Sequence, residues 1–428
     1  MRLNKWHKVV FFSPNCPLED YHLHTLPNGI RIAHKQVPHT QIAHVGLMLD
    51  IGSRDELPHQ QGLAHFWEHM AFKGTTRRQA HHIINRLENV GGELNAYTTK
   101  EKICFHASVL GVHTEKAVEL LADIAFHSTF PERQIERERG VILEEMSMYY
   151  DSPEDAIQDD FDQLVFPDHP LGANILGTSE TVRSFTKTSL ETFIQENLDT
   201  SRIVFSSVSN MPFGKVLKLA EKHLRQVPGK SALRQRQAPA HYVPTHHRLP
   251  RPITQAQVAL GRPAYSLTDP RRLPFFMLVN LLGGPGMNSR LNMNLRERFG
   301  LVYAIDAGYT PYLDTGYLGI YFGTDPKQID RSLTLTYREF KNLRENLLTT
   351  SQLHNTKAQL MGQLAMAEEG NNSFMLMMAK SLLDIGRVES LTDIFTDIEA
   401  ITARQLQEVA VDVLDETQFS TLFFTPEK

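Results

Sequence analysis

Cysteine and long apolar runs are both scarce in this sequence. Its two thiols, Cys16 and Cys104, are too few for the disulfide framework of a small secreted domain. Near the N-terminus only four apolar residues (9–12) follow one another, where a secretory signal needs about 7–15. Nowhere does the chain reach the roughly 18 apolar residues of a membrane-spanning helix. These absences predict a soluble, cytoplasmic protein with no membrane partner.

An excess of positive charge is also missing. The 44 Lys and Arg are outnumbered by 49 Asp and Glu, which gives a formal net charge of −5. Proteins that bind nucleic acids attract phosphates through basic surfaces, so we expect no nucleic acid as a partner. A hydrophobic content of 41% is typical of a folded globular chain, and 428 residues are enough for two domains or more.

Residues 226–251 differ from the rest of the chain. They contain four prolines and several basic residues and show no apolar periodicity. This composition predicts an exposed linker between a first half, residues 1–225, and a second half, residues 252–428. Both halves show the same order of elements, with a strand, two helices, two strands and a further helix. We therefore predict an α+β fold of two homologous domains, each with an antiparallel-rich sheet flanked by helices.

The apolar patterns also place the individual elements. In the first half we expect strands over 42–49, 93–98 and 102–110, and helices over 65–72, 83–90 and 115–125. In the second half we expect strands over 255–260, 301–309 and 316–323, and helices over 273–282, 291–299 and 328–343. The tripeptides 96–98 and 308–310 then occupy equivalent places, which supports a duplicated unit.

The first half carries the pattern H-x-x-E-H, formed by His65, Glu68 and His69. On a helix with about 3.6 residues per turn these positions share one face, and two histidines at i and i+4 can bind one Zn²⁺. Such pairs also occur by accident on solvated helices. Here the neighbours include phenylalanine, tryptophan and methionine, and burying unpartnered imidazoles would cost several kcal/mol. A bound metal is therefore the better interpretation.

A catalytic zinc needs three protein ligands and one open position. The acidic, helix-like segment 137–146 is our candidate for the third ligand. Glu138 and Glu145 are seven residues apart and share a face, whereas Glu144 points about 100° away from Glu145. The spacing alone does not choose among these carboxylates.

Together these segments resemble the inverted zincins and, more narrowly, the pitrilysin and mitochondrial-processing-peptidase family of zinc metallopeptidases, over roughly residues 21–424. The resemblance implies a zinc metalloendopeptidase with one Zn²⁺ per chain. It implies Glu145, which lies 76 residues after His69, as the third ligand. It also implies that Glu138 orients a metal-bound histidine and that Glu68 is the general base.

The resemblance further implies where a substrate lies. A peptide or unfolded polypeptide segment would add as a β-strand beside residues 93–98, where Asn95, Ala96 and Tyr97 would contact it. The alternative is that residues 93–98 form an interior strand.

Two more pairs of residues match functional positions of the family. Asp155 and Asp159 match acidic positions that accept a basic substrate residue in the processing enzymes, although a solvated acidic helix face fits them equally well. Arg296 and Tyr303 match an arginine and a tyrosine that face the zinc across the cleft and donate hydrogen bonds to the substrate. Without the resemblance, we would interpret Arg296 as a solvated helix charge.

Family members of this length usually assemble as dimers. We expect a homodimer, and a heterodimer with an inactive paralogue stays open. The alternative function is a non-catalytic scaffold or regulatory subunit of a heterodimeric peptidase. Such relatives typically lack part of the H-x-x-E-H motif, whereas His65, Glu68 and His69 are all present.

Overall fold

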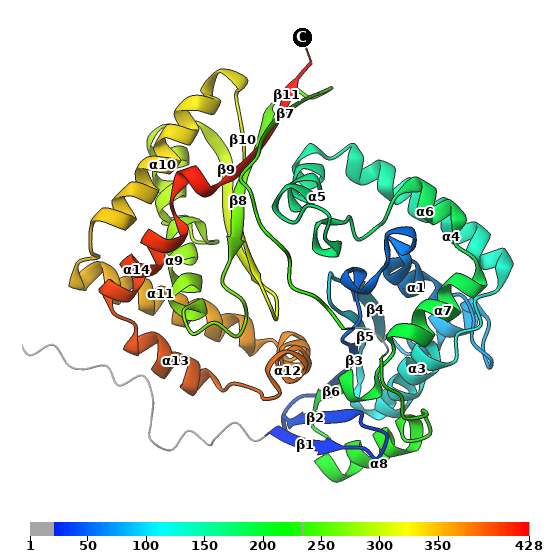
Figure 1. Ribbon diagram of the computed structural model, residues 1–428. Coiled ribbons are helices and arrows are strands. Elements are labelled where there is room, and N and C mark those ends of the chain that lie inside the picture. Colours follow the sequence, from blue (N-terminus) through cyan, green and yellow to red (C-terminus); the bar gives the residue numbers. More distant parts are fainter. Residues whose placement is uncertain (1–20, 233–234, 428) are drawn as a thin grey trace, which may run out of the picture.

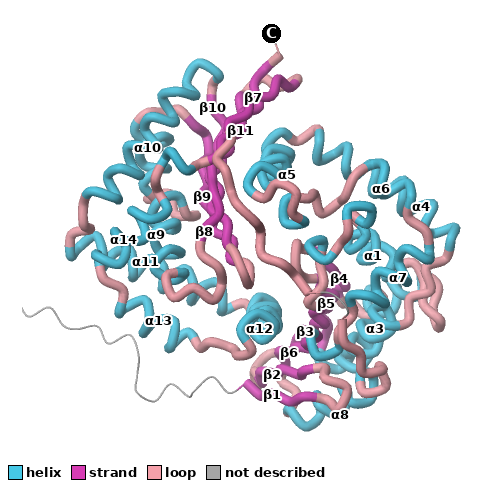
Figure 2. Tube along the Cα trace, viewed as in Figure 1, coloured by secondary structure: helices cyan, strands magenta, loops and turns pink. Residues whose placement is uncertain are grey.

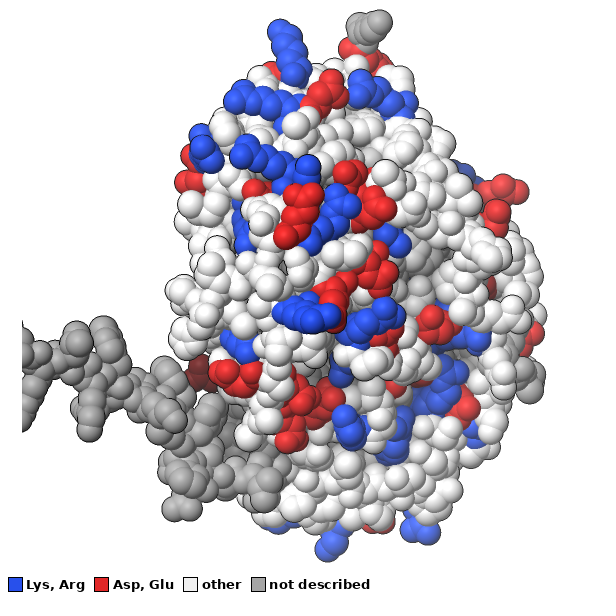
Figure 3. Space-filling model, turned by 60° about the vertical axis from the view of Figure 1, so that its left-hand side comes forward, with Lys and Arg blue, Asp and Glu red and all other residues white. Residues whose placement is uncertain are grey.

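The computed structural model describes residues 21–232 and 235–427 (Figure 1). Cys16 and the N-terminal residues 1–20 lie outside the described residues, as do 233–234 and 428. None of the helices in the described part of the chain is long and apolar enough to cross a bilayer. On the face drawn in Figure 3, basic and acidic side chains are interspersed, so that face carries no extended field of one sign.

The first half forms a six-stranded sheet with helices around it. The strand order is β1-β2-β6-β3-β5-β4, and only β2 and β6 run parallel to each other. The strands are β1 (Tyr21–Thr25), β2 (Arg31–Gln36), β3 (Ile42–Leu49), β4 (Glu93–Thr98), β5 (Ile103–Leu110) and β6 (Ile203–Ser209). The helices are α1 (Leu63–Ala71), α2 (Ala80–Glu88), α3 (Thr114–Phe126), α4 (Glu132–Tyr150), α5 (Pro153–Val165), α6 (Ser179–Ser184), α7 (Lys187–Asn197) and α8 (Phe213–Leu224).

The second half repeats this arrangement with five strands. Their order is β7-β11-β8-β10-β9, and only β7 and β11 are parallel. The strands are β7 (His246–Arg251), β8 (Ala256–Ala264), β9 (Val302–Pro311), β10 (Gly316–Thr324) and β11 (Ser420–Pro426). The helices are α9 (Arg272–Gly283), α10 (Ile329–Glu345), α11 (Thr350–Glu369), α12 (Asn371–Ile385), α13 (Leu391–Ala400) and α14 (Ala403–Val413). The helix expected at 291–299 is a π-helical segment, Asn292–Arg298.

The two sheets match strand for strand. From β2 to β4 and from β7 to β9, each sheet has one parallel pair followed by three antiparallel pairs. The equivalent tripeptides 96–98 and 308–310 lie on the corresponding edge strands, β4 and β9. The predicted fold class, two related α+β units with antiparallel-rich sheets, is confirmed.

Each half also covers the sheet of the other half (Figures 1 and 2). Helix α12 of the second half packs on β3 and β6 of the first, and α5 of the first half packs on β8, β10 and β11 of the second. The first contact joins Phe374, Met375 and Met378 to Met48 and Val204. The second joins Ile157, Phe161 and Val165 to Ala259, Tyr317 and Leu422. Neither half therefore buries its own sheet completely, because one face of each sheet depends on a helix from the other half.

The structure corrects the expected linker of residues 226–251. Most of its described residues are exposed, but its last six residues form β7 at the edge of the second sheet. Proline is tolerated in an edge strand because one side of that strand has no ladder partner, and Pro250 lies in β7. The prolines suggested a segment without regular structure, whereas they are compatible with this edge strand.

Candidate metal centre

Helix α1 carries the H-x-x-E-H motif, and its N-terminus is held by a buried carboxylate. The backbone N–H groups of Gly62 and Ala64 donate to Glu56 at 2.9 and 2.7 Å. A negative charge is favourable at a helix N-terminus, where backbone donors are otherwise unpaired. Burial raises the pKa of Glu56, and the two N–H donors oppose that shift. Glu56 could not be recognised from the sequence, because an acidic residue six positions before Gly62 is a weak capping signal.

Gly62 allows the helix to begin where it does. Its φ of +95° lies in the left-handed region that favours glycine. A Cβ atom at this position would also lie 2.4 Å from the carbonyl oxygen of Leu176. The start of α1 is therefore fixed both by backbone conformation and by the close approach of the segment before α6.

The apolar side of α1 sets the direction of its histidines. Phe66, Trp67 and Met70 are fully buried in the core of the first half, and the Trp67 ring packs edge-on against Phe105. Since positions i, i+3 and i+4 share a face, the opposite side presents His65, Glu68 and His69 together. The ring centroids of the two histidines are 4.6 Å apart.

The third member of the site comes from α4. Glu145 Oε1 lies 3.9 Å from His65 Nε2, and Glu145 Oε2 lies 3.6 Å from His69 Nε2. One ligand atom from each of the three residues lies within 4.8 Å of the others. We call His65, His69 and Glu145 the metal trio. In the part of the chain that the structure describes, it is the one group of three such side chains that could hold a metal ion.

The donor set of the trio fits zinc. Zinc bonds to histidine nitrogen and carboxylate oxygen are about 2.0–2.2 Å long, so donors around one ion lie roughly 3–4 Å apart. The separations of 3.6 and 3.9 Å agree with this spacing. Burial, with a smaller effect from His69, lowers the pKa of His65 to about 3, which keeps this imidazole neutral as a metal ligand must be. The protein therefore offers two imidazole nitrogens and one carboxylate, with no further side chain needed.

Glu138 lies on the same face of α4 and holds the second histidine. Its Oε2 is 3.2 Å from His69 Nδ1, and its Oε1 is 2.8 Å from Lys73 Nζ. Burial alone would raise the pKa of Glu138, but the hydrogen bond with His69 and the charge of Lys73 bring it below its usual value. An ionised Glu138 accepts a hydrogen bond from the Nδ1–H group of His69, which leaves His69 Nε2 free to face Glu145.

Glu68 lies beside the trio and is hydrogen-bonded to β4. The Thr98 hydroxyl donates to Glu68 Oε2 at 2.6 Å. Burial raises the pKa of Glu68, the nearby Glu145 carboxylate adds to this shift, and the hydrogen bond from Thr98 opposes it. Thr98 was not among the residues predicted to belong to the site. The period of two along a strand could have indicated it, because Thr98 shares a face with Ala96.

The predicted substrate strand lies at an edge. β4 pairs only with β5, so its other backbone edge has no partner strand among the described residues. Ala96 packs with the core beneath α1. Tyr97 instead packs in the apolar cluster beneath α12, on the other face of the sheet. Asn95 points to the same face as Tyr97, because side chains two residues apart in a strand lie on one face. The side chain of Tyr97 therefore points away from the metal trio, and its predicted contact with substrate stays a prediction.

The two predicted acidic residues lie on α5, directly after α4. Asp155 accepts a hydrogen bond from Ser152 Oγ at 2.6 Å, and Asp159 accepts one from Asn174 Nδ2 at 2.9 Å. Burial raises the pKa of Asp159 to about 6. Besides burial, the negative charges of Glu145, Asp155 and Asp159 all raise the pKa of Tyr149. The two aspartates therefore share an electrostatic environment with a member of the trio.

Arg296 and Tyr303 contact each other in the second half. The guanidinium carbon of Arg296 is 5.8 Å from the centroid of the Tyr303 ring, and Tyr303 is 82% exposed. Within the described residues, no hydrogen bond or ion pair joins either side chain to the metal trio. Their predicted contact with a substrate across the cleft stays a prediction.

Sequence comparisons cover almost the whole chain. The family model described as insulinase (peptidase family M16) matches residues 31–179, and the model described as peptidase M16 inactive domain matches residues 184–360. An uncharacterised zinc protease of Bacillus subtilis is 32% identical over 393 residues, which are 92% of this chain and 95% of the relative. An uncharacterised zinc protease of Streptomyces coelicolor is 33% identical over 401 residues, 91% of this chain and 86% of the relative.

Solved structures share the fold. A protease from Helicobacter pylori superposes with a TM-score of 0.88 at 20% identity, over 96% of this chain and 100% of that one. A structure described as a peptidase M16 inactive domain from Pseudomonas fluorescens gives a TM-score of 0.88 at 18% identity, over 96% and 99%. At such low identity these likenesses establish the arrangement of elements and nothing about the chemistry.

Proposed function

Because the chain belongs to peptidase family M16, we propose that it is a zinc metalloendopeptidase that hydrolyses peptides or unfolded polypeptide segments. The observation that carries this proposal is the meeting of His65, His69 and Glu145 beside the carboxylate of Glu68. The relatives at 32–33% identity are named zinc proteases, which supports the choice of metal.

The residues of the site have separable roles in this reaction. His65 Nε2, His69 Nε2 and a carboxylate oxygen of Glu145 would hold the ion. When bound, zinc supplies Lewis acidity, which lowers the pKa of water and polarises a peptide carbonyl group. Glu68 accepts a proton from the attacking water at its carboxylate and transfers it to the leaving amine nitrogen. Glu138 keeps the Nδ1 proton on His69 and so directs Nε2 toward the ion.

The edge of β4 is the surface we propose for the substrate backbone. An extended peptide can add to a free strand edge through main-chain hydrogen bonds, and alternate side chains then enter pockets on either side. A folded protein cannot present its backbone in this way, so unfolded segments are the expected substrates. The hydrogen bond from Thr98 to Glu68 links this strand to the proposed general base.

We propose a homodimer as the working assembly, with a heterodimer of this chain and an inactive paralogue as the alternative. The alternative function is that of a non-catalytic scaffold or regulatory subunit. The complete H-x-x-E-H motif and the nearby Glu145 argue against it, because a subunit without catalytic activity does not need them. Light scattering of the purified chain would distinguish a dimer from a monomer that awaits a partner.

The test of the proposed function is metal-dependent cleavage. We expect about one zinc per chain, and cleavage of a chemically denatured protein that a chelator abolishes and added zinc restores. Zinc content is measured by elemental mass spectrometry, and cleavage by the appearance of new peptide termini. Bound zinc without any cleavage would favour the scaffold, and cleavage that survives complete removal of the metal would contradict the proposal.

The acidic residues of α5 lead to a prediction about substrate preference. We propose that Asp155 and Asp159 attract a basic substrate residue near the scissile bond. Replacing both with asparagine should lower kcat/KM for an arginine-containing peptide by about three- to tenfold, because ion pairs near a protein surface are each worth about 0.2–1 kcal/mol. Cleavage of the matching peptide with a neutral residue should change less than twofold.

The control for this pair is Glu154→Gln, which removes an exposed carboxylate from the same helix. It should leave both peptides equally good substrates. An equal loss for the arginine and the neutral peptide in the double variant would assign the two aspartates to the solvated helix face instead.

A further inference from the structure

Three consecutive charged residues are buried in the turn that follows β4. Lys100, Glu101 and Lys102 are only 7%, 7% and 5% exposed. A buried charge without a partner is costly, so each must be paired. Lys100 Nζ lies 3.1 Å from Asp162 of α5 and donates to the carbonyl oxygen of Ala173 at 2.6 Å.

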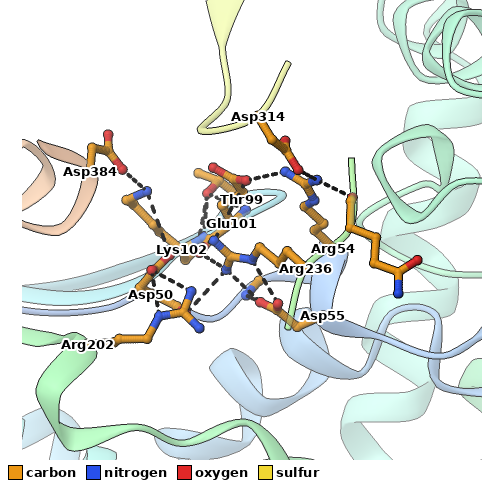
Figure 4. Close-up of polar contacts among 12 residues, drawn as sticks. Asp50, Arg54, Asp55, Thr99, Glu101, Lys102, Arg202, Arg236, Asp314 and Asp384 are labelled. Atoms are coloured by element: carbon orange, nitrogen blue, oxygen red, sulfur yellow. Dashed lines mark hydrogen bonds and ion pairs between the residues drawn. The ribbon is translucent and has the colours of Figure 1, made fainter. Parts of the chain in front are cut away.

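Ion pairs connect the other two charged residues, Glu101 and Lys102, to the second half (Figure 4). Lys102 is ion-paired with Asp384 of α12. Glu101 accepts from Arg54 Nη1 at 2.7 Å, and the other terminal nitrogen of Arg54 lies 2.5 Å from Asp314 in the turn between β9 and β10. The turn of residues 99–102 is thus the place where the second half reaches the strand proposed to bind substrate.

The backbone of the same turn is held from the first half. The N–H groups of Ser53 and Arg54 donate to the carbonyl oxygens of Thr99 and Lys100 at 3.3 and 2.7 Å. The backbone of Gly52 lies so close to the turn that a Cβ atom on Gly52 would be 2.4 Å from the Thr99 carbonyl oxygen. With backbone contacts on one side and ion pairs on the other, the position of the turn depends on both halves.

The linker joins the same network. Arg236 donates from Nε and Nη2 to the two carboxylate oxygens of Asp55 at 2.8 and 2.7 Å, and from Nη1 to Asp50 Oδ1 at 2.8 Å. Its Nη2 also donates to the carbonyl oxygen of Glu101 at 3.0 Å. Arg202 also binds Asp50. Figure 4 shows these side chains converging on the turn.

Thr98 is the residue immediately before this turn, and its hydroxyl holds Glu68 Oε2 at 2.6 Å. A glutamate side chain has several rotatable bonds, so one short hydrogen bond decides much of its orientation. With Oε2 engaged by Thr98, the other carboxylate oxygen is the one free to face a reacting water. A shift of the turn would move the Thr98 hydroxyl and release the carboxylate.

We propose that Thr98 is a positioning residue for Glu68. The ion pair of Lys102 with Asp384, and the bridge from Glu101 through Arg54 to Asp314, keep Thr98 in place. This inference rests on the proposed role of Glu68 as general base. It gives the second half a part in catalysis that does not require contact with substrate: the interface between the halves sets the orientation of the base. A purely structural network would stabilise the fold without affecting kcat selectively.

Thr98 is tested by a pair of variants that differ in one hydroxyl. Thr98→Val keeps the β-branched shape and removes the donor, and it should lower kcat about tenfold with KM changed less than twofold, as expected for losing a hydrogen bond to a charged group. Thr98→Ser restores the donor and should recover most of kcat. Zinc content should be the same in both. Equal kcat for the valine variant and the original protein, or failure of serine to rescue, would overturn the positioning role.

The dependence on the second half is tested at α12. Asp384→Asn should lower kcat about three- to tenfold with little change in KM, because small displacements of a catalytic group are costly. The matched control is Lys380→Gln, since Lys380 is the exposed partner of Asp384 on the same helix and does not reach the turn. The control should keep the original kcat, and equal kcat in the two variants would refute the link.

A second readout does not need the active enzyme. In the metal-free protein, amide hydrogens of peptides covering residues 93–102 should exchange faster in Asp384→Asn than in Lys380→Gln, because the turn has lost an ion pair. Unchanged exchange at 93–102 would overturn the proposed link even if kcat fell. The kcat of Glu68→Gln distinguishes failure of the proposed function from failure of this inference. If that variant is fully active, the proposed function itself fails; if it is inactive while Thr98→Val is normal, only this inference fails.

Discussion

Glu68→Gln is expected to retain zinc and to lose about 10²- to 10⁴-fold in kcat, the usual contribution of a general base. The amide has nearly the shape of the carboxylate and can still accept the hydrogen bond from Thr98, so the fold around α1 should not change. It cannot take a proton from water. Because Glu68 is not a member of the metal trio, zinc content should stay near one per chain.

The measurement combines kcat at saturating peptide with zinc analysis of the same preparation. A loss of zinc together with activity would mean that Glu68 belongs to the ligand set. Activity close to that of the original protein would remove Glu68 from the mechanism altogether, and with it the proposed reaction.

Replacing a member of the trio should have the other large effect, and Glu145→Gln gives the sharpest version of this test. Replacing a residue that is hydrogen-bonded to a metal ligand lowers metal affinity roughly 10- to 100-fold. Replacing the ligand Glu145 itself should lower zinc affinity by more than this, and peptide cleavage should disappear with the metal. The physical reason is that a carboxylate ligand, whose two oxygens lie 3.9 Å from His65 Nε2 and 3.6 Å from His69 Nε2, is replaced by a neutral amide. His69→Ala should lose both zinc and activity because it removes an imidazole nitrogen of the metal trio.

The neighbouring residue supplies the matched control. Glu144→Gln makes the same chemical change one position earlier on α4, at an exposed side chain. Zinc titration by calorimetry on both metal-free variants should show weak binding only for Glu145→Gln. Equal losses in the two variants would mean that the general acidity of α4, rather than a specific third ligand, attracts the ion.

Much of the fold was predictable because the relevant information is local. The alternating residues of 42–49 and 93–98 predicted strands with those bounds, and both strands are observed. The H-x-x-E-H spacing brought two histidines and a glutamate to one helix face without any tertiary information. The family resemblance and the α+β fold are confirmed by the comparisons and by the matching sheets. The linker was harder, because proline suggests a break in regular structure and equally suits an edge strand such as β7.

The site itself was predictable only in part. The face shared by Glu138 and Glu145 follows from helix geometry, but the resemblance was needed to choose between these carboxylates and Glu144. Thr98 and Glu56 were missed, since a hydroxyl on a strand and an acid before a helix are common. Their importance lies in what they contact, which is Glu68 for one and the first turn of α1 for the other.

The positions of most elements, the duplicated order of elements and the helix with the H-x-x-E-H motif could be predicted from the sequence, because each shows in patterns of nearby residues. Two features are visible only in three dimensions: α12 and α5 each cover the sheet of the opposite half, and Lys102 meets Asp384 across 282 positions. Buried apolar faces and buried charges both require partners, but local periodicity does not indicate which distant residue each of them contacts. That choice follows from packing two sheets against each other, and in this protein it places the second half next to the strand that holds Glu68.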